Sequence, residues 1–435
     1  MKFHGSSGAT TLLGMPGFVV GVQVDVGGEW WLSVETTVAV VACSGCGTRA
    51  VGHGRRRVRV RDLEISGRAT VLCWAKRIWR CPDSDCEVET WSERCEHIEP
   101  GGLLTVRAAA EICRAVGADG SSVAAQARRF GVSWAAAMAA VGRHGTPLIE
   151  VPARLEAATA IGVDETTFLH AAAARRTQYV TGIIDLDRGR LLDVVPGRSA
   201  RVLGDWLTAQ TVDWRAQVTV AALDAFRGYA NALAAHLPDA MLVMDHFHTI
   251  QLANRALDKV RRRTQTDTLG HRGQSADPLY RIRRLALLGA GRLDEKGWDR
   301  LEAGLAAGDP AGEVAAAWIA KEELRLMYRA RSPEAVRRAL TRFYTHCAAN
   351  DHIPELVTLA TTISTWQTEI LNYHNGHFSN GPTEAVNLII EKTRRIGHGF
   401  RNFHNYRLRL LLACGVKWHT PVVARIRGRQ PRLSA

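Results

Sequence analysis

Four cysteines in two close pairs have the types and spacing of a metal site. Cys43 and Cys46 are separated by two residues within CSGCG, and Cys81 and Cys86 by four residues within CPDSDC. Four thiolates in two such pairs can meet at one tetrahedral zinc ion, and a reducing compartment favours metal binding over disulfides. We therefore predict one structural Zn²⁺, with a redox pair or buried thiols as the alternatives.

Three carboxylates form a second candidate site. Asp164 and Asp224 follow the apolar runs TAIGV and VTVAAL, and we expect both to project from strand ends of one sheet. Glu384 is expected in the first turn of a helix opened by Ser379 or Asn380, at the positive end of the helix dipole. Such oxygen ligands suit Mg²⁺ or Mn²⁺, and two ions could stabilise both oxygens of an in-line phosphoryl displacement. Each acid alone could be a turn or cap residue, so the interpretation depends on the set.

Two further groups of titratable residues lie near these acids. Asp245 and His248 are three residues apart where a strand is expected to give way to a helix. They could support the acids without binding metal or could cap the following helix, and both interpretations stay open. Asp185, Asp187 and Asp193 are competing acids, but we expect them in a hairpin turn and its exit, where acids are routine.

The charge of the chain favours a nucleic-acid partner. It carries 56 Lys+Arg against 43 Asp+Glu, a net charge of +13, and seven of the basic residues are Lys. Arginine binds phosphate through two parallel hydrogen bonds. A GC-rich genome could also explain the excess of Arg over Lys, but it would not explain the net positive charge. No apolar run reaches the ~20 residues that span a bilayer, and the N-terminus lacks a signal-peptide pattern. We therefore expect a cytoplasmic protein that does not act on membranes.

The order of elements predicts a multidomain α/β protein. A length of 435 residues exceeds the usual ~150-residue domain about threefold. Residues 17–42 read as a hairpin, strands and helices mix after about 149, and helical spacing alone follows from about 249 to 375. The predicted parts are a β-hairpin and zinc-binding module (1–100), a helix-turn-helix domain (101–148), a catalytic domain in two parts (149–262 and 371–435) and an all-helical insertion between them (263–370).

The segment SSVAAQARRFGVSWAAAMAAVGRHG has the outline of a helix-turn-helix. We expect a first helix capped by Ser121 or Ser122, a turn at residues 131–133 and a second helix from Trp134. The start of the second helix would then face base edges in a DNA groove. Because this helix is poor in polar residues, the zinc module could share sequence recognition, and a plain helical hairpin is the alternative.

Basic segments flank both candidate sites. Residues 49–80 hold ten basic side chains, and RRIGHGFRNFHNYRLR follows Glu384. Either segment could bind the phosphate backbone or could simply be a solvated face. The residues expected to contact DNA are Arg55, Arg56, Arg57, Arg59, Ser133, Arg143, Lys392, Arg394, Arg395 and Arg401.

These segments together resemble, almost from end to end, the bacterial insertion-sequence transposases of the ISL-three family, in the DDE class. The matching segments are CSGCG with RIWRCPDSDC, GVSWA, IGVDETTF, LDAFRGYANALAAHLPDAMLVMDHFHTIQLANRALDKVRRR and SNGPTEAVNLIIEKTRRIGHGFRNFHNYRLR. Ala385 stands where Gly is usual and His246 where Arg is usual. Neither departure removes an expected ligand.

The resemblance implies an RNase H-like mixed-sheet catalytic domain whose triad is Asp164, Asp224 and Glu384, with an all-helical insertion between the second and third acids. It also implies hydrolysis at the terminal inverted repeats, followed by attack of the freed 3′ hydroxyl on target DNA with the same two metals. Asp245 and His248 look like the DxxH signature that several DDE families carry.

The implied partners and the rival functions follow from the same resemblance. The partners would be double-stranded DNA, as transposon ends and target, and further copies of the chain in a dimer or higher assembly, in the bacterial cytoplasm at the nucleoid. One rival is a DNA-binding repressor or a domesticated transposase without cleavage activity. The other is a repair or resolvase-type nuclease, which would cut branched or damaged DNA without preferring particular end sequences.

Overall fold

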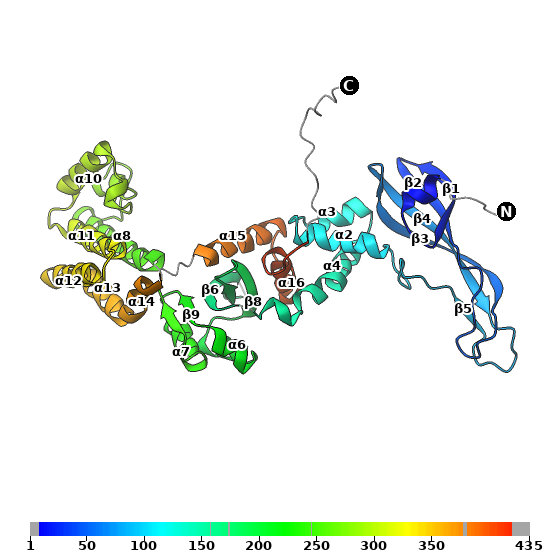
Figure 1. Cartoon of the computed structure of the whole chain (residues 1–435). Coiled ribbons are helices and arrows are strands. Elements are labelled where there is room, and N and C mark those ends of the chain that lie inside the picture. The colour runs from blue at the N-terminus through cyan, green and yellow to red at the C-terminus, as the bar shows by residue number, and fades with distance from the viewer. Residues whose placement is uncertain (1–7, 157, 173–174, 245, 377–380, 420–435) are drawn as a thin grey trace, which may run out of the picture. The chain divides into compact units, whose positions relative to one another are not determined.

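The computed structural model describes residues 8–156, 158–172, 175–244, 246–376 and 381–419 (Figure 1). The chain divides into two compact units, one of residues 1–154 with 389–435 and one of residues 155–388. The division falls inside helix α15, which spans Gly381–Ile396. Within the described ranges, no helix is both long and apolar enough to cross a membrane.

The first unit begins with a short helix and a five-stranded sheet. These elements are α1 (Gly8–Leu13), β1 (Phe18–Val26), β2 (Glu29–Thr36), β3 (Val51–Ile65), β4 (Arg68–Arg80) and β5 (Thr90–Ser92). The strand order is β1-β2-β4-β3, with β5 paired to β4. Strands β2 and β4 are parallel, whereas the other pairs are antiparallel. The side chains that fill this core come from α1, β1, β2, β3 and β4, and Trp74 is the largest of them.

Two-residue turns set the register of both hairpins in this sheet. Gly27 and Gly28 join β1 to β2, and Ser66 and Gly67 join β3 to β4, all four with positive φ. Positive φ at both central residues defines the turn whose twist matches that of antiparallel strands. The hairpin expected within residues 17–42 is therefore present, although its second strand ends at Thr36.

Four helices complete the first unit. They are α2 (Val106–Gly117), α3 (Val123–Phe130), α4 (Trp134–Ile149) and α16 (Phe403–Cys414), the last of which packs against α2 and α4. The hydroxyls of Thr105, Ser122 and Ser133 accept the N-terminal backbone N–H groups of α2, α3 and α4, as good N-caps do. Gly131 ends α3 in the left-handed conformation, and a side chain there would meet the guanidinium of Arg61.

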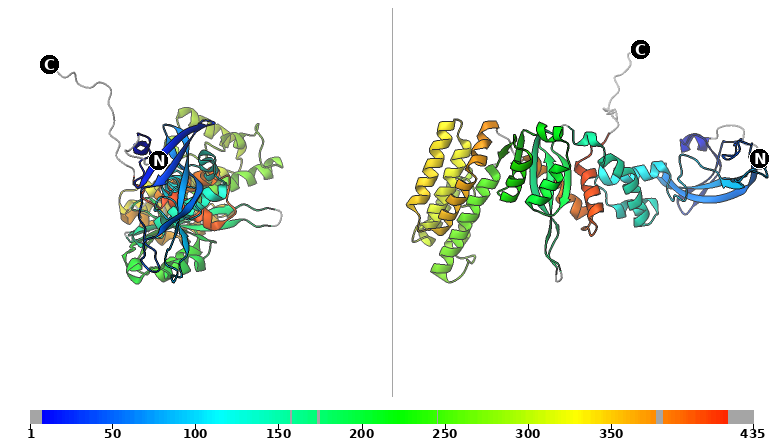
Figure 2. Two further views of the ribbon diagram at one scale, coloured as in Figure 1. Left: turned by 90° about the vertical axis from the view of Figure 1, so that its right-hand side faces the viewer. Right: turned by 90° about the horizontal axis from the view of Figure 1, so that it is seen from below.

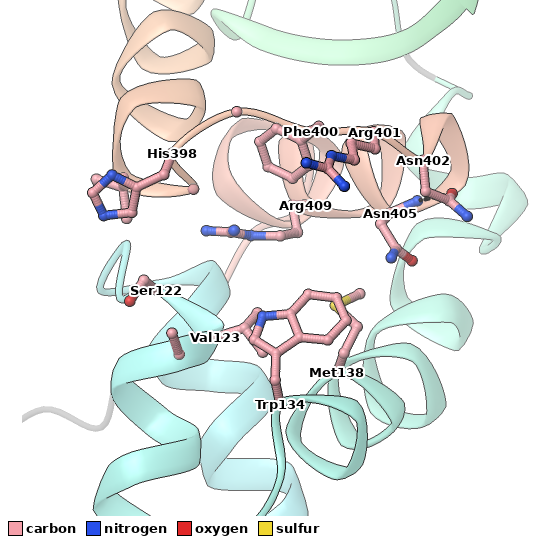
Figure 3. A pocket seen from close by; sticks show the side chains of 14 residues that line it. Ser122, Val123, Trp134, Met138, His398, Phe400, Arg401, Asn402, Asn405 and Arg409 are labelled. Atoms are coloured by element: carbon pink, nitrogen blue, oxygen red, sulfur yellow. Dashed lines mark hydrogen bonds between the residues drawn. The ribbon is translucent and has the colours of Figure 1, made fainter.

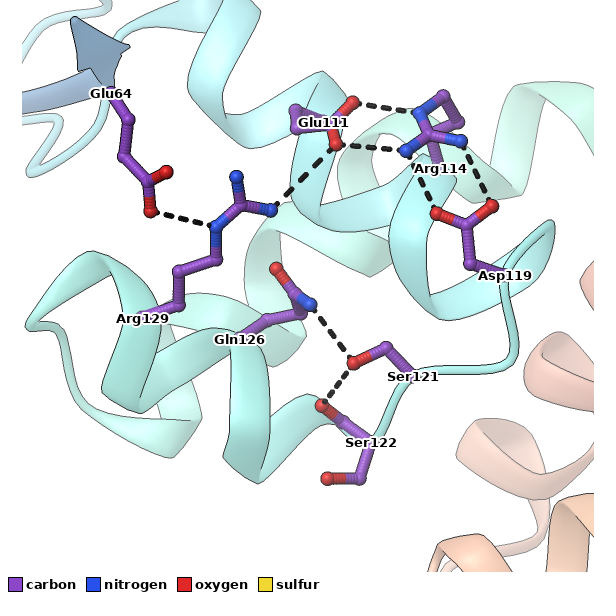
Figure 4. A network of polar contacts seen from close by, with 8 residues as sticks. All are labelled: Glu64, Glu111, Arg114, Asp119, Ser121, Ser122, Gln126 and Arg129. Carbon is purple, nitrogen blue, oxygen red and sulfur yellow. Dashed lines mark hydrogen bonds and ion pairs between the residues drawn. The ribbon is translucent and has the colours of Figure 1, made fainter. Parts of the chain in front are cut away.

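A chain of charged contacts ties α2 and α3 to the sheet (Figure 4). Arg129 on α3 bridges Glu64 of β3, at 3.0 Å, and Glu111 of α2, at 3.9 Å. Glu111 also binds Arg114, which in turn holds Asp119 at 2.8 Å in the α2–α3 loop. Most of these groups are partly exposed, so each pair contributes little alone, but the shared partners link α3 to both β3 and α2.

The second unit contains a mixed five-stranded sheet with three helices beside it. The strands are β6 (Ala160–Leu169), β7 (Gln178–Asp185), β8 (Arg190–Pro196), β9 (Val220–Leu223) and β10 (Met241–Val243). Their order is β10-β9-β6-β7-β8, with β10, β9 and β6 parallel and β7 and β8 antiparallel to their neighbours. The helices are α5 (Ala200–Thr208), α6 (Val212–Gln217) and α7 (Arg227–His236).

A helical block follows the sheet in the second unit. It consists of α8 (His246–Leu269), α9 (Pro278–Ile282), α10 (Glu295–Gly308), α11 (Glu313–Arg329), α12 (Pro333–Ala349), α13 (Pro354–Thr365) and α14 (Gln367–Gly376). No strand occurs in the described residues between β10 and α15, as the helical spacing predicted. Helices α8, α11, α12 and α13 pack along one another (Figure 2), and their apolar residues continue the core of the sheet.

Candidate functional site

The register of β6 and β9 brings two predicted acids together. These parallel strands pair Val163 with Leu223, and Asp164 and Asp224 are the next residues of each chain segment. The prediction that both acids follow strand ends is wrong for Asp164, because β6 continues to Leu169 through Thr166, Thr167 and Phe168, which have high β-propensity. Asp224 does follow the last residue of β9. The two carboxylates therefore share one edge of the β6–β9 pair.

The first turns of helix α8 add a histidine to this pair. Nε2 of His248 lies 2.6 Å from Oδ1 of Asp224, and both side chains are mostly buried. A ring nitrogen at this distance fixes the orientation of the carboxylate. The partner suggested with it, Asp245, lies outside the described residues, so the structure places one member of the predicted pair.

Helix α15 approaches the pair from far along the chain. Nδ2 of Asn387 donates to Oδ2 of Asp164 at 2.5 Å, and the backbone N–H of Glu165 donates to Oδ1 at 2.7 Å. Glu384 lies in the first turn of α15, as predicted, and its side chain is exposed. The helix-opening residues expected at 379 and 380 lie outside the described residues. Asn387 lies three positions after Glu384, so the two share one face of α15.

Burial and mutual repulsion shape the electrostatics of the two aspartates. Burial raises the pKa of Asp164 to about 7, and the negative charge of Asp224 acts in the same direction. The hydrogen bonds from Glu165 and Asn387 oppose the rise. His248, beside Asp224, also opposes the rise. Partly buried acids that repel one another often occur at sites that bind a divalent ion.

The three predicted acids have the oxygen donors that Mg²⁺ or Mn²⁺ prefers, but their carboxylates do not converge on one point. Carboxylate oxygens are the ligands that these ions prefer, so Asp164 and Asp224 fit such a metal. Within the described ranges, however, the four cysteines are the one group of three or more His, Cys, Asp and Glu donors that lie close enough together to share an ion. Glu384 is thus on the adjoining helix, but the structure does not bring its carboxylate and those of the two aspartates together around one point.

A pocket of about 250 Å³ opens beside Asp224. Its polar lining includes Glu165, Arg198, His248, Gln251 and Arg255. Arg198 binds Glu165 at 2.7 Å, and Arg255 binds the side-chain oxygen of Gln251 at 2.8 Å. The pocket thus places two guanidinium groups near Asp224, and guanidinium groups are well suited to bind phosphate groups.

The competing acids of the β7–β8 region serve the local structure. Asp185 accepts the backbone N–H of Arg188, and Asp187 accepts both the backbone N–H and the hydroxyl of Thr159. Asp193 accepts the indole N–H of Trp206 at 3.0 Å. Asp185 thus stabilises the β7–β8 turn, whereas Asp187 and Asp193 bind Thr159 and Trp206, so all three acids have partners in the local structure.

The four predicted cysteines converge at a single point of the first unit. The Sγ atoms of Cys43 and Cys86 are 3.7 Å apart, those of Cys46 and Cys81 are 3.5 Å apart, and all four lie within 4.8 Å of one another. Two sulfurs bound at 2.3 Å to a tetrahedral zinc are separated by about 3.8 Å, so the spacing fits. Cys95 instead lies against the carbonyl of Ile98, outside the cluster.

Backbone N–H groups prepare one of these thiols to act as a ligand. The N–H groups of Cys46 and Gly45 donate to Sγ of Cys43 and lower the pKa of that thiol to about 7, the distance from Gly45 being 3.4 Å. Burial acts the other way on Cys81, whose pKa it raises. A bound cation would offset that burial cost, because a coordinated thiol is deprotonated.

The side chains expected to contact DNA differ in how free they are. Arg55, Arg56, Arg57 and Arg59 lie on the exposed part of β3, and Arg55 binds Glu35 at 3.0 Å. The other predicted residues are two on α4, Ser133 and Arg143, and four near the end of α15, Lys392, Arg394, Arg395 and Arg401.

Three of the six predicted side chains on α4 and near the end of α15 also have partners within the protein. The hydroxyl of Ser133 caps α4, Arg143 binds Glu99, and Arg394 binds Glu391 at 2.5 Å. Lys392, Arg395 and Arg401 are exposed. Among the described residues, the exposed members of the predicted set without an ion pair or ring contact are therefore Arg56, Arg57, Lys392, Arg395 and Arg401.

Comparison with known proteins decides the family. A transposase family model, DDE_Tnp_ISL3, matches residues 161–410, more than half of the chain and the whole segment that carries the acids. The chain belongs to the ISL3 transposase family. A second model, the zinc-finger of transposase IS204/IS1001/IS1096/IS1165, matches residues 39–86 of this ISL3-family chain, which include all four clustered cysteines. The sequence-based assignment is thereby confirmed, and the zinc finger with it.

Individual relatives carry the same description. The ISL3-family chain is 30% identical over 262 residues to the transposase for insertion sequence element IS1557 of Mycobacterium tuberculosis, a match that covers 56% of this chain and 57% of that protein. It is 24% identical over 403 residues to the transposase for IS1001 of Bordetella parapertussis, covering 89% and 92%. The Drosophila P element transposase strand transfer complex aligns at 9% identity with a TM-score of 0.37, covering 70% of this chain and 91% of that chain, too weak a likeness to argue from.

Sequence reasoning missed several residues of the site. Asn387, Glu165 and Arg198 carry no motif spacing of their own. The segment TEAVN does place Asn387 three residues after Glu384, on one helical face, which was the available signal. Arg255 lies seven residues after His248 on α8, a spacing that also repeats one helical face.

Proposed function

We propose that this ISL3-family protein cuts DNA at the terminal inverted repeats of an insertion sequence and joins the freed 3′ hydroxyl ends to target DNA, in a reaction that depends on Mg²⁺ or Mn²⁺. The observation that carries the proposal is the register of β6 and β9, which sets Asp164 beside Asp224 within the segment that the transposase model matches. Glu384, one helical turn before Asn387, is the proposed third acid.

The proposed catalytic domain is RNase H-like. Its support is the strand order β10-β9-β6-β7-β8, in which three successive antiparallel strands are followed by two parallel ones, with the helical block inserted before α15. The proposed DNA-recognition half consists of the zinc finger and the α3–α4 pair, which a three-residue turn joins at Gly131. A dimer or higher assembly on DNA is part of this proposal, because two transposon ends must be held together.

The residues of the site have separable roles in this chemistry. Asn387 holds one oxygen of Asp164, and His248 orients Asp224. Arg198 and Arg255 line the adjoining pocket, where they would bind the phosphates on either side of the scissile bond. When bound, two divalent ions would supply positive charge to the attacking and leaving oxygens of the phosphoryl transfer.

Excision in a bacterial host tests this function. A marker cassette bounded by the DNA that flanks this gene is supplied with the intact protein, with Asp224→Asn or with Asp187→Asn, a matched change at a turn. We expect excision with the intact protein and Asp187→Asn, and none with Asp224→Asn. Binding of the flanks without excision by any variant would instead support a DNA-binding repressor, and cutting of branched DNA without preference for these ends would support a repair nuclease.

A further inference from the structure

A second pocket, of about 320 Å³, lies in the first unit, away from the acids (Figure 3). Its wall on one side comes from the first turns of α3 and α4, including Ser122 and Trp134. The opposite wall comes from the segment that joins α15 to α16 and from α16 itself, with Phe400, Asn402 and Arg409. Neither the zinc site nor the acid site uses these residues.

Arg409 is the feature that marks this pocket as a binding site. Its side chain extends from α16 into the space above Trp134, and the residue is 6% exposed. Among the described residues it has no hydrogen-bond acceptor or carboxylate, and its buried Nε atom is unpartnered. Burial alone lowers the pKa of Arg409. A buried guanidinium without a hydrogen-bond acceptor is costly even beside the ring of Phe400, so a ligand that supplies acceptors is the natural explanation.

The other polar groups of the pocket also suit an anion. The described residues that line it include Arg401 and His398 and contain no Asp or Glu. Asn402 caps α16 by accepting the N–H of Asn405, and Ser122 caps α3, so two helix N-termini open on the pocket. The electrostatic character is therefore positive on both walls.

The pocket also contains aromatic rings, which binding of a free anion does not require. Trp134 is the first residue of α4, and 52% of it is exposed although it is one of the largest apolar side chains. Phe400 lies on the opposite wall, with its ring 5.2 Å from Cζ of Arg409. An exposed indole beside a guanidinium offers a base a stacking face and its phosphate a charge-assisted donor.

We propose that this pocket binds one nucleotide of DNA whose base is unpaired, with the phosphate at Arg409 and the base against Trp134. The proposal rests on the proposed function only in taking DNA as the partner. It assigns the pocket to single-stranded DNA rather than to duplex, since a base can reach Trp134 only when it is free of its complement. Inorganic phosphate is the alternative occupant, because it would satisfy Arg409 without using Trp134.

Because Arg409 lacks a hydrogen-bond acceptor, an experiment can distinguish a role in ligand binding from a role in folding. If Arg409 serves the fold, replacing it destabilises the protein. If it serves a ligand, Arg409→Met removes a buried charge while keeping the volume, so the melting temperature of the free protein stays the same or rises while DNA affinity falls. Exposed Trp134 supplies a second variant whose folding is not in question.

The test measures the binding of a fluorescein-labelled 20-nucleotide thymidine strand and of a 20-base-pair duplex by anisotropy, in buffer without divalent ions. For the single strand we expect roughly a tenfold loss of affinity with Trp134→Ala and with Arg409→Met. For the duplex we expect less than a twofold change. Trp134→Phe keeps a stacking face and should stay within about threefold of the intact protein, and Arg300→Met on exposed α10 removes the same charge as a control.

Each other outcome overturns a defined part of the account. Equal losses on single strand and duplex, or no loss on either, would contradict the nucleotide pocket. A lower melting temperature for Arg409→Met together with full affinity of Trp134→Ala would make the arginine structural. If inorganic phosphate raised the melting temperature of the intact protein as much as the single strand does, the pocket would be an anion site only. Failure of the intact protein to bind either DNA would overturn the proposed function itself.

Discussion

The amide nitrogen of Asn387 lies 2.5 Å from Oδ2 of Asp164, although 223 residues separate them in the chain. The contact brings α15, and with it Glu384, to the strand that carries the first acid. Because the interaction uses a neutral donor, it orients Asp164 without neutralising the charge that a divalent ion would need. Asn387 is thus proposed as a positioning residue for the acid site.

Replacing Asn387 by Ala should slow DNA strand cleavage by roughly 10- to 100-fold, the usual value of a hydrogen bond to a charged group. The amide holds down the pKa of Asp164, so its loss raises that pKa and moves the acidic limb of the pH–rate profile to higher pH. Single-turnover cleavage over a range of pH measures both effects. Asn375→Ala, at an exposed position of α14, is the control. An unchanged profile would make the contact incidental to catalysis.

Stabilisation by Mn²⁺ should depend on pH in a direction that the aspartate pair fixes. Since the folded protein raises the pKa of Asp164 from 3.8 to about 7, the contribution of this group to stability is full below pH 3.8 and is lost as the pH rises through about 7. A cation that binds the carboxylate must displace the proton below that value. The rise in melting temperature with Mn²⁺ should therefore be small at pH 5.5 and larger at pH 8.

The control for this effect is Asp224→Asn, which removes one acid of the pair. It should abolish the Mn²⁺-induced rise at both values of pH. A rise of the same size at pH 5.5 and pH 8, or one that survives in the variant, would show that the ion binds elsewhere.

Elemental analysis of the purified protein should find one zinc per chain. Cys81→Ser should reduce this to near zero and should leave residues 39–86 open to protease, because a structural zinc contributes its binding free energy to folding. Cys95→Ser, at a half-buried thiol outside the cluster, should keep both the metal and the protection. Full zinc content in Cys81→Ser would contradict the assignment of the ligands.

The exposed part of β3 should contribute to duplex binding through charge. Arg56→Gln with Arg57→Gln removes two exposed cations, and each phosphate contact adds about 0.9 to the slope of log affinity against log salt. The slope should therefore fall by about 1.8. Arg300→Gln with Arg338→Gln is the matched control on the helical block. Equal slopes for the two double variants would show that DNA does not contact the exposed part of β3.

Some of the site could be predicted from the sequence because it depends on local spacing. The cysteine pairs and the apolar run before Asp224 are visible in a few residues each. The contacts of Asn387 with Asp164 and of His248 with Asp224 are not, because packing of distant segments creates them.

The strands were harder to delimit than the helices. Strands β3 and β4 run for 15 and 13 residues. The Arg-rich segment between the cysteine pairs is β-like in sequence, but the exposed arginines of GHGRRRVRVRD interrupt the apolar alternation that would mark where β3 begins. The extension of β6 past Asp164 was missed for a related reason: DETTF reads as a turn when the pairing with β7 is not known. Tertiary pairing, rather than local pattern, determines both elements.

The most direct test of the central claim is metal-dependent cleavage of end-labelled DNA from the flanks of this gene by purified protein. Asp164→Asn, Asp224→Asn and Glu384→Gln are compared with the intact protein and with Asp187→Asn. The account predicts cleavage only with Mg²⁺ or Mn²⁺. Each of the three site variants should lose roughly 100-fold or more of the cleavage rate while keeping DNA binding, and Asp187→Asn should cleave at the rate of the intact protein. Cleavage that persists in Asp224→Asn, or that needs no divalent ion, would contradict it.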